Sequence, residues 1–528
     1  MDNCLNTSKK ILDLLRIPYT KEYLKDTVLT HPEHPSLLAI ADAFDKYKIE
    51  NLAISVGIQK LREMPLPCII QVKRNHHTLF HVLKEFTGTE AICYDEKNAL
   101  VRLPMESFQK SWTGVSLLVE KNPDSQEEGI LKKQRAKMGI NALKISVLAL
   151  FLLWGLLSFS SRVNQGTDLN IYYTAAYTLV KLAGLVIGSM LLWFEVDEFN
   201  PTLQQFCSGG SKTDCNAVLN SKYARLFGDS LSLSTIAFSY FFGTLGYLLI
   251  SGFSLSAMAL LSNLSYLALP IILLSLYYQA FVIKQWCKFC IAIQLALGFE
   301  VLFASLSGIG VTQIEVSGLA SLFALLLLPV LSWKLIKPLL LHRKQSGLVN
   351  RGLKKIKNNP AVLKSLLSKS DRLDQVPDQL GINIRRSTAE YNLIKVCNPF
   401  CGPCSKAHPV LEELVDKGKI NLQIIFTANP DEENQATEVV RHFMALYSGD
   451  NELRLRKALD DWYRNDKKEY SNLSGEYPLN GELAEQTGQL HAMFNWCRDT
   501  GITHTPTVFI DGYELPVEYT IEDLKEVL

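Results

Sequence analysis

The sequence predicts a multidomain protein with an α+β domain first, an all-α transmembrane bundle of six spans in the middle, and an α/β domain last. Three observations predict this fold class. The chain has 528 residues, which is enough for several domains. Apolar residues are concentrated between about 140 and 341, whereas both flanks have the composition of soluble protein. Six of the eleven cysteines fall in three close pairs: Cys207 with Cys215, Cys287 with Cys290, and Cys401 with Cys404.

Changes in composition divide the chain into five segments. These are 1–130, the α+β domain; 131–171, a charged linker and the first span; 172–341, the other spans; 342–385, a basic linker; and 386–528, the α/β domain. The net charge of +1, without a basic face interleaved with aromatics, gives no indication of a nucleic-acid partner. The first thirty residues lack the apolar core of a cleavable signal peptide.

The N-terminal segment combines helical and extended patterns. Apolar residues recur at helical spacing in 5–16 and 36–48. Short β-like runs follow at 68–72, 79–83 and 91–94. We therefore expect a compact α+β domain with its own core.

The runs LREMPLPCIIQV, HTLFHVLKE and YDEKNALVRLPMESFQKSWTGVSLLVE give this domain a family resemblance. They resemble the papain-like cysteine peptidase domain that trims leader peptides from bacteriocins, over roughly residues 4–120. The resemblance implies that Cys4 is the nucleophile at a helix N-terminus, that His81 is the base, and that Asp95 orients the imidazole. A thiolate at a helix N-terminus beside an imidazole is a sound nucleophile.

The sequence departs from that family around the cysteine. Only three residues precede Cys4, so the glutamine that binds the oxyanion in the family has no counterpart. Loss of an oxyanion donor typically slows catalysis by ~10²–10³-fold. We therefore favour a degenerate peptidase fold kept for binding over an active protease. No cysteine or carboxylate lies at ligand spacing beside His76, His77 and His81, so we expect no metal there.

The middle of the chain predicts an integral membrane protein. A membrane-spanning helix needs about 20 apolar residues. Charged residues near the spans, Lys181, Glu195 and Asp197, are expected at the membrane interface. Six stretches qualify: 140–160, 173–194, 231–251, 255–283, 288–309 and 317–341.

Two of the cysteine pairs are expected at one membrane face. Two spans separate Cys215 from Cys287, and an up-and-down pair of helices returns the chain to the side it left. Cys287 and Cys290 lie one turn apart where an apolar segment begins, and a helix N-terminus stabilises a thiolate. Such a pair suits the reduction of a lipophilic two-electron acceptor in the bilayer, and a quinone fits this description.

The loop cysteines followed by VLNSKYARLFG, together with WCKFC at the start of a later span, resemble vitamin K epoxide reductase and its bacterial homologues. The resemblance covers the last five spans and implies a four-helix-bundle core. It implies that Cys290 faces the quinone, ubiquinone or menaquinone, and that Cys287 exchanges with Cys215. Cys207 would then receive electrons from the C-terminal domain.

Two polar residues are candidate supporting groups in this region. The family's spacing places a hydroxyl at Ser221, which would position the loop; a helix N-cap is the other interpretation. Gln294, one turn beyond Cys290, is a candidate hydrogen-bond donor to the quinone, and a helix-packing amide is the alternative.

The C-terminal segment alternates strand, helix and strand around CGPC and THTPTVFIDG. CGPC at a helix start and TPT before a strand resemble the thioredoxin fold with a helical insertion, as in bacterial disulfide oxidoreductases. The resemblance implies a cis peptide between Thr505 and Pro506, an attacking thiolate at Cys401 and a resolving thiol at Cys404. A zinc site is disfavoured because no second ligand pair lies at suitable spacing. His408 is expected at the surface.

Together these features predict a membrane thiol oxidase that forms disulfides in exported proteins or peptides and passes the electrons to the quinone pool. Disulfide formation belongs on the oxidising side. We therefore expect a bacterial inner membrane protein whose cysteines and two soluble domains face the periplasm. The alternatives are a leader-peptide cysteine protease and a peptide-binding module, each with accessory redox domains. The positive-inside rule favours the opposite orientation, because basic residues flank the first and last spans: Lys132, Lys133, Arg135, Lys137, Lys144, Lys334, Lys337, Arg343 and Lys344.

Overall fold

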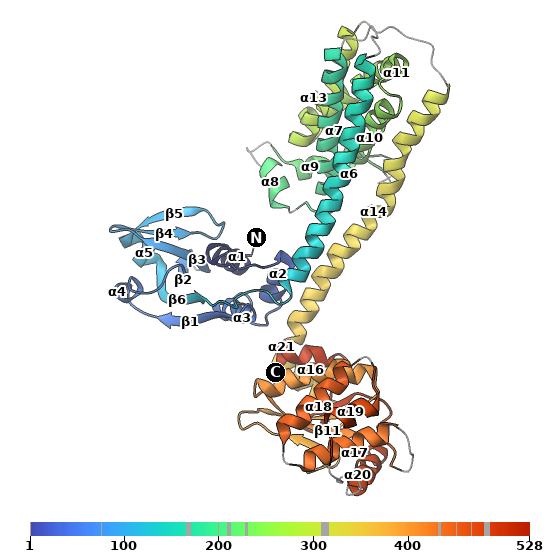
Figure 1. Ribbon diagram of the computed structural model, residues 1–528. Coiled ribbons are helices and arrows are strands. Elements are labelled where there is room, and N and C mark those ends of the chain that lie inside the picture. Colours follow the sequence, from blue (N-terminus) through green and yellow to red (C-terminus); the bar gives the residue numbers. More distant parts are fainter. Residues whose placement is uncertain are drawn as a thin grey trace. The chain divides into compact units, whose positions relative to one another are not determined.

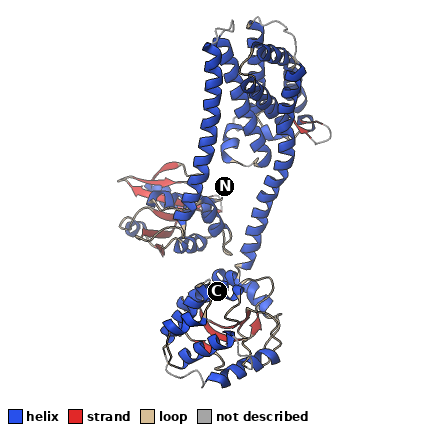
Figure 2. Ribbon diagram, turned by 45° about the vertical axis from the view of Figure 1, so that its right-hand side comes forward, coloured by secondary structure: helices blue, strands red, loops and turns tan. Residues whose placement is uncertain are grey.

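A computed structural model describes the chain except for some short segments (Figures 1 and 2). Contacts divide the chain into two compact units, one made of 1–130 and 349–528 and the other of 131–348. Figure 2 shows that the strands lie in the two terminal parts, apart from one short pair in the helical part. The described ranges are 2–74, 77–164, 171–198, 200–207, 213–226, 231–307, 316–430, 435–449, 451–465, 467–479 and 486–528.

The N-terminal part is the predicted α+β domain. Its six-stranded sheet is antiparallel throughout, in the order β1-β6-β2-β3-β4-β5. Ile11, Phe44 and Phe80 belong to a core between the first three helices and the sheet, and Phe108 of α5 belongs to a second core. The elements are α1 (Asn3–Leu15), α2 (Lys21–Leu29), α3 (Leu37–Lys46), β1 (Ile49–Ser55), α4 (Ile58–Leu61), β2 (Cys68–Arg74), β3 (His77–Phe86), β4 (Glu90–Tyr94), β5 (Leu100–Pro104), α5 (Met105–Ser111) and β6 (Trp112–Lys121).

The middle part is a bundle of long apolar helices with short elements at one end. Pro270 ends the helical hydrogen bonding near Leu267 because its ring clashes with the carbonyl four residues earlier. The elements are α6 (Ile130–Asn164), α7 (Ile171–Val196), α8 (Pro201–Cys207), α9 (Cys215–Leu219), the 3₁₀ helix η1 (Lys222–Ala224), β7 (Arg225–Leu226), β8 (Leu231–Ser232), α10 (Leu233–Ile250), α11 (Leu255–Tyr266), α12 (Ala268–Tyr277), the π-helix η2 (Tyr278–Ile283), α13 (Lys288–Leu306) and α14 (Val316–Lys357).

Five of the six predicted spans have helical counterparts long and apolar enough to cross a membrane. The stretch 140–160 lies within the 35-residue helix α6 but is not among the spans found in the described residues, so the sixth span stays a prediction. The five are Tyr172–Val196, Leu233–Ile250, Leu255–Ile283, Lys288–Leu306 and Gly318–Lys357.

The C-terminal part has the predicted thioredoxin-like fold with a helical insertion. Its five-stranded sheet has the order β13-β12-β10-β11-β9, and only β10 and β11 pair in parallel. Helices α17 to α20 form the insertion between β11 and β12. The elements are α15 (Pro360–Leu367), β9 (Ile382–Ile384), β10 (Tyr391–Cys397), α16 (Gly402–Asp416), β11 (Ile420–Phe426), α17 (Gln435–Ser448), α18 (Glu452–Arg464), α19 (Tyr470–Glu476), α20 (Thr487–Asp499), β12 (Thr507–Ile510), β13 (Tyr513–Glu514), η4 (Ile521–Asp523) and α21 (Leu524–Val527).

Candidate active site

The loop cysteines form a disulfide. Cys207 ends α8 and Cys215 begins α9, and their Cα atoms are 5.8 Å apart. Asp214 starts α9 because its carboxylate Oδ1 accepts hydrogen bonds from the amides of Asn216 (2.9 Å) and Ala217 (3.1 Å). Both cysteines are buried, and Cys207 keeps 8% of its surface exposed.

The second pair lies beside this disulfide. The Asp214 amide donates to the Trp286 carbonyl at 3.2 Å, which places the residue before Cys215 against the residue before Cys287. Cys287 is the N-cap of α13, and its sulfur accepts from the Cys290 amide at 3.3 Å. Cys207, Cys215 and Cys287 belong to one apolar cluster, and Cys290 packs against it. The structure therefore brings the two predicted pairs together.

Neighbouring side chains fix this arrangement. Gln279 of the π-helix accepts the Cys287 amide through Oε1 at 2.9 Å. Ser221 precedes η1 but makes no capping hydrogen bond; its hydroxyl donates instead to the Val218 carbonyl of α9 at 2.7 Å. Two residues after Ser221, the ring of Tyr223 stacks on the ring of Tyr278, with the ring centres 4.5 Å apart. These contacts tie the segment after Cys215 to the helix that leads to Cys287.

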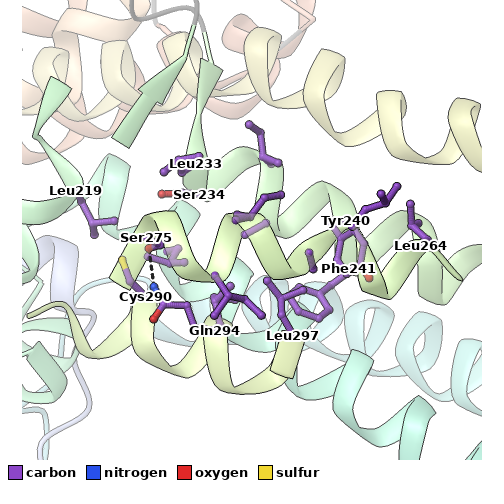
Figure 3. Close-up of a pocket in the computed structure, with 18 residues that line it drawn as sticks. Leu219, Leu233, Ser234, Tyr240, Phe241, Leu264, Ser275, Cys290, Gln294 and Leu297 are labelled. Atoms are coloured by element: carbon purple, nitrogen blue, oxygen red, sulfur yellow. Dashed lines mark hydrogen bonds between the residues drawn. The ribbon is translucent and has the colours of Figure 1, made fainter. Parts of the chain in front are cut away.

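An apolar cavity of about 220 Å³ lies beside Cys290. Figure 3 shows Cys290, Ser275 and Gln294 at one end of it and Tyr240 at the other. The Gln294 side-chain NH₂ donates to the Ser275 hydroxyl, and its Oε1 has no hydrogen-bond partner among the residues that the structure describes. The walls are almost entirely aliphatic: Leu191, Leu219, Leu233, Ile236, Ala237, Leu264, Leu267, Ala268, Ile271, Ile272, Ile293 and Leu297, with Phe241 and Ser234.

The third pair is built as the CGPC motif predicts. Cys401 is the N-cap of α16, and its sulfur accepts from the Cys404 amide at 3.4 Å. The Thr505–Pro506 peptide is cis, and the Cys401 thiol donates to the Thr505 carbonyl at 3.2 Å. This contact joins the two motifs that are distant in sequence. The loop before β12 therefore holds Cys401, the more exposed cysteine of the pair, in place.

The two thiols of this pair have opposite pKa shifts. Burial raises the pKa of Cys401, but hydrogen bonds with the side chains of Thr505 and Cys404 and with the Cys404 amide, and the charge of Lys395, outweigh burial and leave the pKa below its ordinary value. Burial, followed by the charge of Cys397 and the bond to Cys401, raises the pKa of Cys404 to about 12. Cys401 is thus suited to attack a disulfide or to be attacked within one, and Cys404 is suited to stay protonated until it resolves.

Two lysines near this pair were not predicted. Lys395 of β10 is fully buried, with its Nζ 3.4 Å from the Cys404 carbonyl and 4.6 Å from the centre of the Tyr463 ring. Lys468 donates to the Pro399 carbonyl at 3.2 Å and to the Ser405 hydroxyl at 2.6 Å. The sequence did contain a signal for Lys395, because it is a lysine inside the apolar strand YNLIKVC.

We expect Lys395→Met to raise the pKa of Cys401, because methionine keeps the volume and removes the positive charge that stabilises the thiolate. At neutral pH the variant then holds less thiolate and is alkylated more slowly. The measurement is the pH dependence of iodoacetamide alkylation of Cys401 in the reduced protein. Lys419→Met, at an exposed position, is the control. An unchanged pH profile in Lys395→Met would show that the buried charge does not act on this thiol.

The N-terminal candidates are arranged differently from the predicted triad. His81 Nε2 lies 3.2 Å from Glu96 Oε2, so Glu96 takes the place expected for Asp95. Asp95 instead accepts the amides of Lys97 (2.9 Å) and Ala99 (2.8 Å) in its own turn. The reason is local. The short aspartate side chain follows a strand, and in such a turn its carboxylate accepts hydrogen bonds from the backbone amides two to four residues later.

Cys4 lies next to a different imidazole. Ligand atoms of Asp2, Cys4 and His34 are all within 4.8 Å of one another, a group that the sequence did not single out. That the protein as a whole holds no metal stays a prediction. Burial, and then the charge of Asp2, raises the pKa of Cys4 to about 12. At neutral pH this thiol is protonated, which is unfavourable for a nucleophile. His76 lies outside the described residues.

Three parts of the chain match three known families. The Peptidase C39 family model matches residues 3–124, the vitamin K epoxide reductase family model matches 175–305, and a thioredoxin family model matches 383–528. The middle match contains all four membrane cysteines. The family matches and the five apolar helices support a membrane protein with an oxidoreductase part that acts on disulfides.

Solved structures similar to parts of the chain fall into two groups. A double glycine motif protease from an AMS/PCAT transporter, solved with a leader peptide, is 25% identical, with 23% of this chain and 85% of that chain covered and a TM-score of 0.21. BdbD from Bacillus subtilis is 11% identical (28% and 89% covered, TM-score 0.24), and DsbA from Chlamydia trachomatis is 14% identical (30% and 93%, TM-score 0.24). No curated protein matches the chain.

Two predicted locations differ from the structure. His408 is buried rather than at the surface, 3.3 Å from Asp460 and packed on the Tyr463 ring, and burial lowers its pKa. Lys181 is not at an interface: it is fully buried in the vitamin K epoxide reductase-like bundle and pairs with Glu300 of α13 at 3.0 Å. The partner lies in another span, so the sequence near Lys181 gave no sign of it.

Proposed function

We propose that this protein is a membrane thiol oxidase that generates disulfides in exported proteins and delivers the electrons to a quinone. The observation that carries the proposal is the apolar cluster that holds the Cys207–Cys215 disulfide against Cys287, with the cavity beside Cys290. A disulfide and a dithiol in contact can exchange, and a dithiol beside an apolar cavity can reduce a lipophilic acceptor.

The electrons move in pairs through three disulfide exchanges. A substrate dithiol attacks the Cys401–Cys404 disulfide, so that the substrate is oxidised and this pair becomes a dithiol. The Cys401–Cys404 dithiol then reduces the Cys207–Cys215 disulfide. The Cys207–Cys215 dithiol formed in that step is reoxidised to a disulfide by exchange with the Cys287–Cys290 disulfide, which becomes a dithiol. The last dithiol, at Cys287 and Cys290, transfers two electrons to the acceptor and returns to a disulfide.

The residues of the cavity fit a quinone. Its aliphatic walls match the apolar ring and tail of ubiquinone or menaquinone, and the polar groups lie at its ends. We propose that Gln294 helps to bind the quinone. Its side-chain NH₂ is held by the Ser275 hydroxyl, and its unpaired Oε1 can accept a hydrogen bond from a quinol hydroxyl. A bound quinone supplies a two-electron acceptor; the protein contributes the dithiol and the walls that exclude water.

We propose that the cysteines lie on the periplasmic side of a bacterial inner membrane, because disulfide formation belongs on the oxidising side. Part of the basic charge that opposes this orientation is paired. Lys337 of α14 lies 2.7 Å from Glu195, and Lys344 lies 2.8 Å from Asp197. These two lysines are therefore not free cationic charges beside the last span. Both soluble domains would face the periplasm, where exported thiol substrates fold.

The experiment that tests the proposal is quinone reduction by membranes that carry the protein, with a reduced cysteine-containing peptide as electron donor. We expect one quinol formed per peptide disulfide. Peptide oxidation without quinone reduction would overturn the assignment of the acceptor. Cleavage of the peptide in place of oxidation would favour the protease.

We propose that the Peptidase C39-like domain binds a peptide and does not cleave it. With a pKa of about 12, Cys4 holds a thiolate fraction on the order of 10⁻⁵ at pH 7. We therefore expect Cys4→Ala to leave disulfide formation unchanged and wild-type protein to leave leader-type peptides uncut. Mass spectrometry of the peptide and the oxidase assay are the measurements. Cys68→Ala, equally buried in the same domain, controls for the cavity that the substitution leaves. Peptide cleavage that is lost in Cys4→Ala alone would establish the protease instead.

A further inference from the structure

A charged cluster lies in the interior of the membrane bundle. Lys181 of α7 and Glu300 of α13 have no exposed side-chain surface, and their charged atoms are 3.0 Å apart. Burial of two charges among apolar helices is expensive, and such residues in membrane spans usually have a function. None of the thiol exchanges proposed above uses them.

The cluster is connected to the cavity through one side chain. Tyr240 of α10 lines the cavity, and its hydroxyl donates to Glu300 Oε2 at 2.7 Å. Figure 3 shows Tyr240 at the end of the cavity remote from Cys290. The Lys181 ammonium also lies over the Tyr240 ring, 4.9 Å from its centre. The phenol hydroxyl at the cavity wall therefore has a carboxylate and an ammonium directly behind it.

Further hydroxyls extend the cluster away from the cysteines. The Ser265 hydroxyl of α11 lies 3.4 Å from Glu300 Oε2 and 2.9 Å from the Tyr177 hydroxyl. One turn nearer the start of α7, Tyr173 and Ser262 form a second hydroxyl pair at 3.1 Å. The starts of α7 and α11 lie at the ends of these helices that are remote from the cysteine pairs.

Glu300 retains an unfilled position. Its Oε1 is buried and has no hydrogen-bond partner among the residues that the structure describes. Buried polar atoms are normally hydrogen-bonded, so an unpaired one calls for an explanation. Tyr240, Ser265 and Lys181 all lie at the other oxygen, Oε2, so Oε1 is open to a further hydrogen.

We propose that the Lys181–Glu300 pair supplies, through Tyr240, a proton required when a quinone in the cavity is reduced; this rests on the oxidase function proposed above. The dithiol reacts with Cys287 as thiolate, because its sulfur is the N-cap that accepts the Cys290 amide, and with Cys290 as thiol. The S–S bond forms, two electrons leave the sulfurs, and the proton of Cys290, the sulfur at the cavity wall, goes to one quinone oxygen. Tyr240 donates the second proton to the other oxygen, the Lys181–Glu300 pair returns a proton to Tyr240, and the pair regains its proton from water. One thiolate, one thiol, one quinone and one proton from water thus give one disulfide and one quinol, so charge and protons balance.

The test compares variants of the full chain in membranes. We expect Glu300→Gln, which keeps the acceptor for Tyr240, to slow quinol formation by ~10²-fold, the usual contribution of a positioned acid. Tyr240→Phe should slow it similarly. Tyr266→Phe is the matched control, because its hydroxyl meets Ser305 at an exposed position outside the cluster. Wild-type rates in both Glu300→Gln and Tyr240→Phe would overturn the proposal.

The double variant Lys181→Met/Glu300→Gln distinguishes a purely structural role of the ion pair from a role in proton supply. Removal of both charges of a buried pair often leaves stability intact, whereas removal of one does not. If the pair only holds the helices together, the double variant recovers the wild-type rate, and the proposal is wrong. If the pair supplies protons, the double variant folds, binds quinone with unchanged affinity and stays slow.

Two further readouts do not depend on the rate alone. Infrared difference spectra of the quinone-treated protein should contain a protonated-carboxyl band that Glu300→Gln removes and Tyr266→Phe retains; absence of the band would contradict the proposal. Reduction of quinone by the wild type in D₂O should be slower than in H₂O, and Glu300→Gln should alter that ratio. If the wild type reduces no quinone at all, it is the oxidase function that fails, not the role of the pair.

Discussion

Cys290→Ala is expected to lower quinol formation by roughly 10³-fold or more, because a redox pair that lacks one sulfur cannot form its disulfide. Cys290 is the thiol at the cavity wall, and Cys287 faces the loop disulfide across the contact between Asp214 and Trp286. Loss of Cys290 leaves the earlier exchanges possible in principle but removes the exit for electrons. The measurement is quinol formation by membranes supplied with a reduced peptide.

The same variant should accumulate reduced cysteines upstream. With no exit, electrons from the peptide stay on the Cys207–Cys215 and Cys401–Cys404 pairs, so both should become accessible to alkylation. Cys497→Ala is a suitable control, since Cys497 is buried in the C-terminal core and lies in no pair. Quinol formation at the wild-type rate in Cys290→Ala would disprove the proposed path through the membrane.

Cys401→Ala is expected to abolish peptide oxidation while sparing quinone reduction driven by a small dithiol. Cys401 has the lowered pKa and contacts the cis-proline loop, so we propose it as the sulfur that reacts with the substrate. A small dithiol such as dithiothreitol can reduce the loop disulfide directly and bypass the soluble domain. The measurement compares quinol formation with the reduced peptide and with dithiothreitol as electron donor, and it shows at which cysteine pair each donor's electrons enter.

Cys404→Ala should give a different result from Cys401→Ala. Without the resolving thiol, a disulfide between the peptide and Cys401 persists, since no neighbouring sulfur displaces the peptide. Non-reducing electrophoresis should show this adduct in Cys404→Ala and not in the Cys401→Ala variant. Loss of activity with the small dithiol in either variant would mean that the soluble pair is needed for membrane chemistry itself, which contradicts the proposed order.

Much of this protein was predictable from local sequence patterns. CGPC before an amphipathic helix and TPT before a strand predicted the thioredoxin-like fold and the cis bond before Pro506, and both were confirmed. Apolar stretches predicted five spans that the structure contains. Cysteine spacing alone singled out the three pairs. Each of these signals lies within one helix, one turn or one short motif, where chain geometry fixes what neighbouring residues do.

Other features depend on contacts between distant residues. The sequence around Lys181 predicted an interfacial charge, because its partner Glu300 lies on another span. Asp95 fitted the family's spacing, yet Glu96, one residue on, contacts His81 since Asp95 is held by its own turn. Periodicity shows which face of an element is apolar but not which charges on different elements meet.

The sequence by itself thus determined the three kinds of domain, five of the six predicted spans and the three cysteine pairs that we propose as electron carriers. Only the tertiary structure decided that the loop disulfide lies against Cys287, that a cavity opens beside Cys290, and that a buried ion pair stands behind Tyr240. The physical reason is that local sequence sets helix, strand and turn, whereas the packing of spans sets which side chains share a water-free interior.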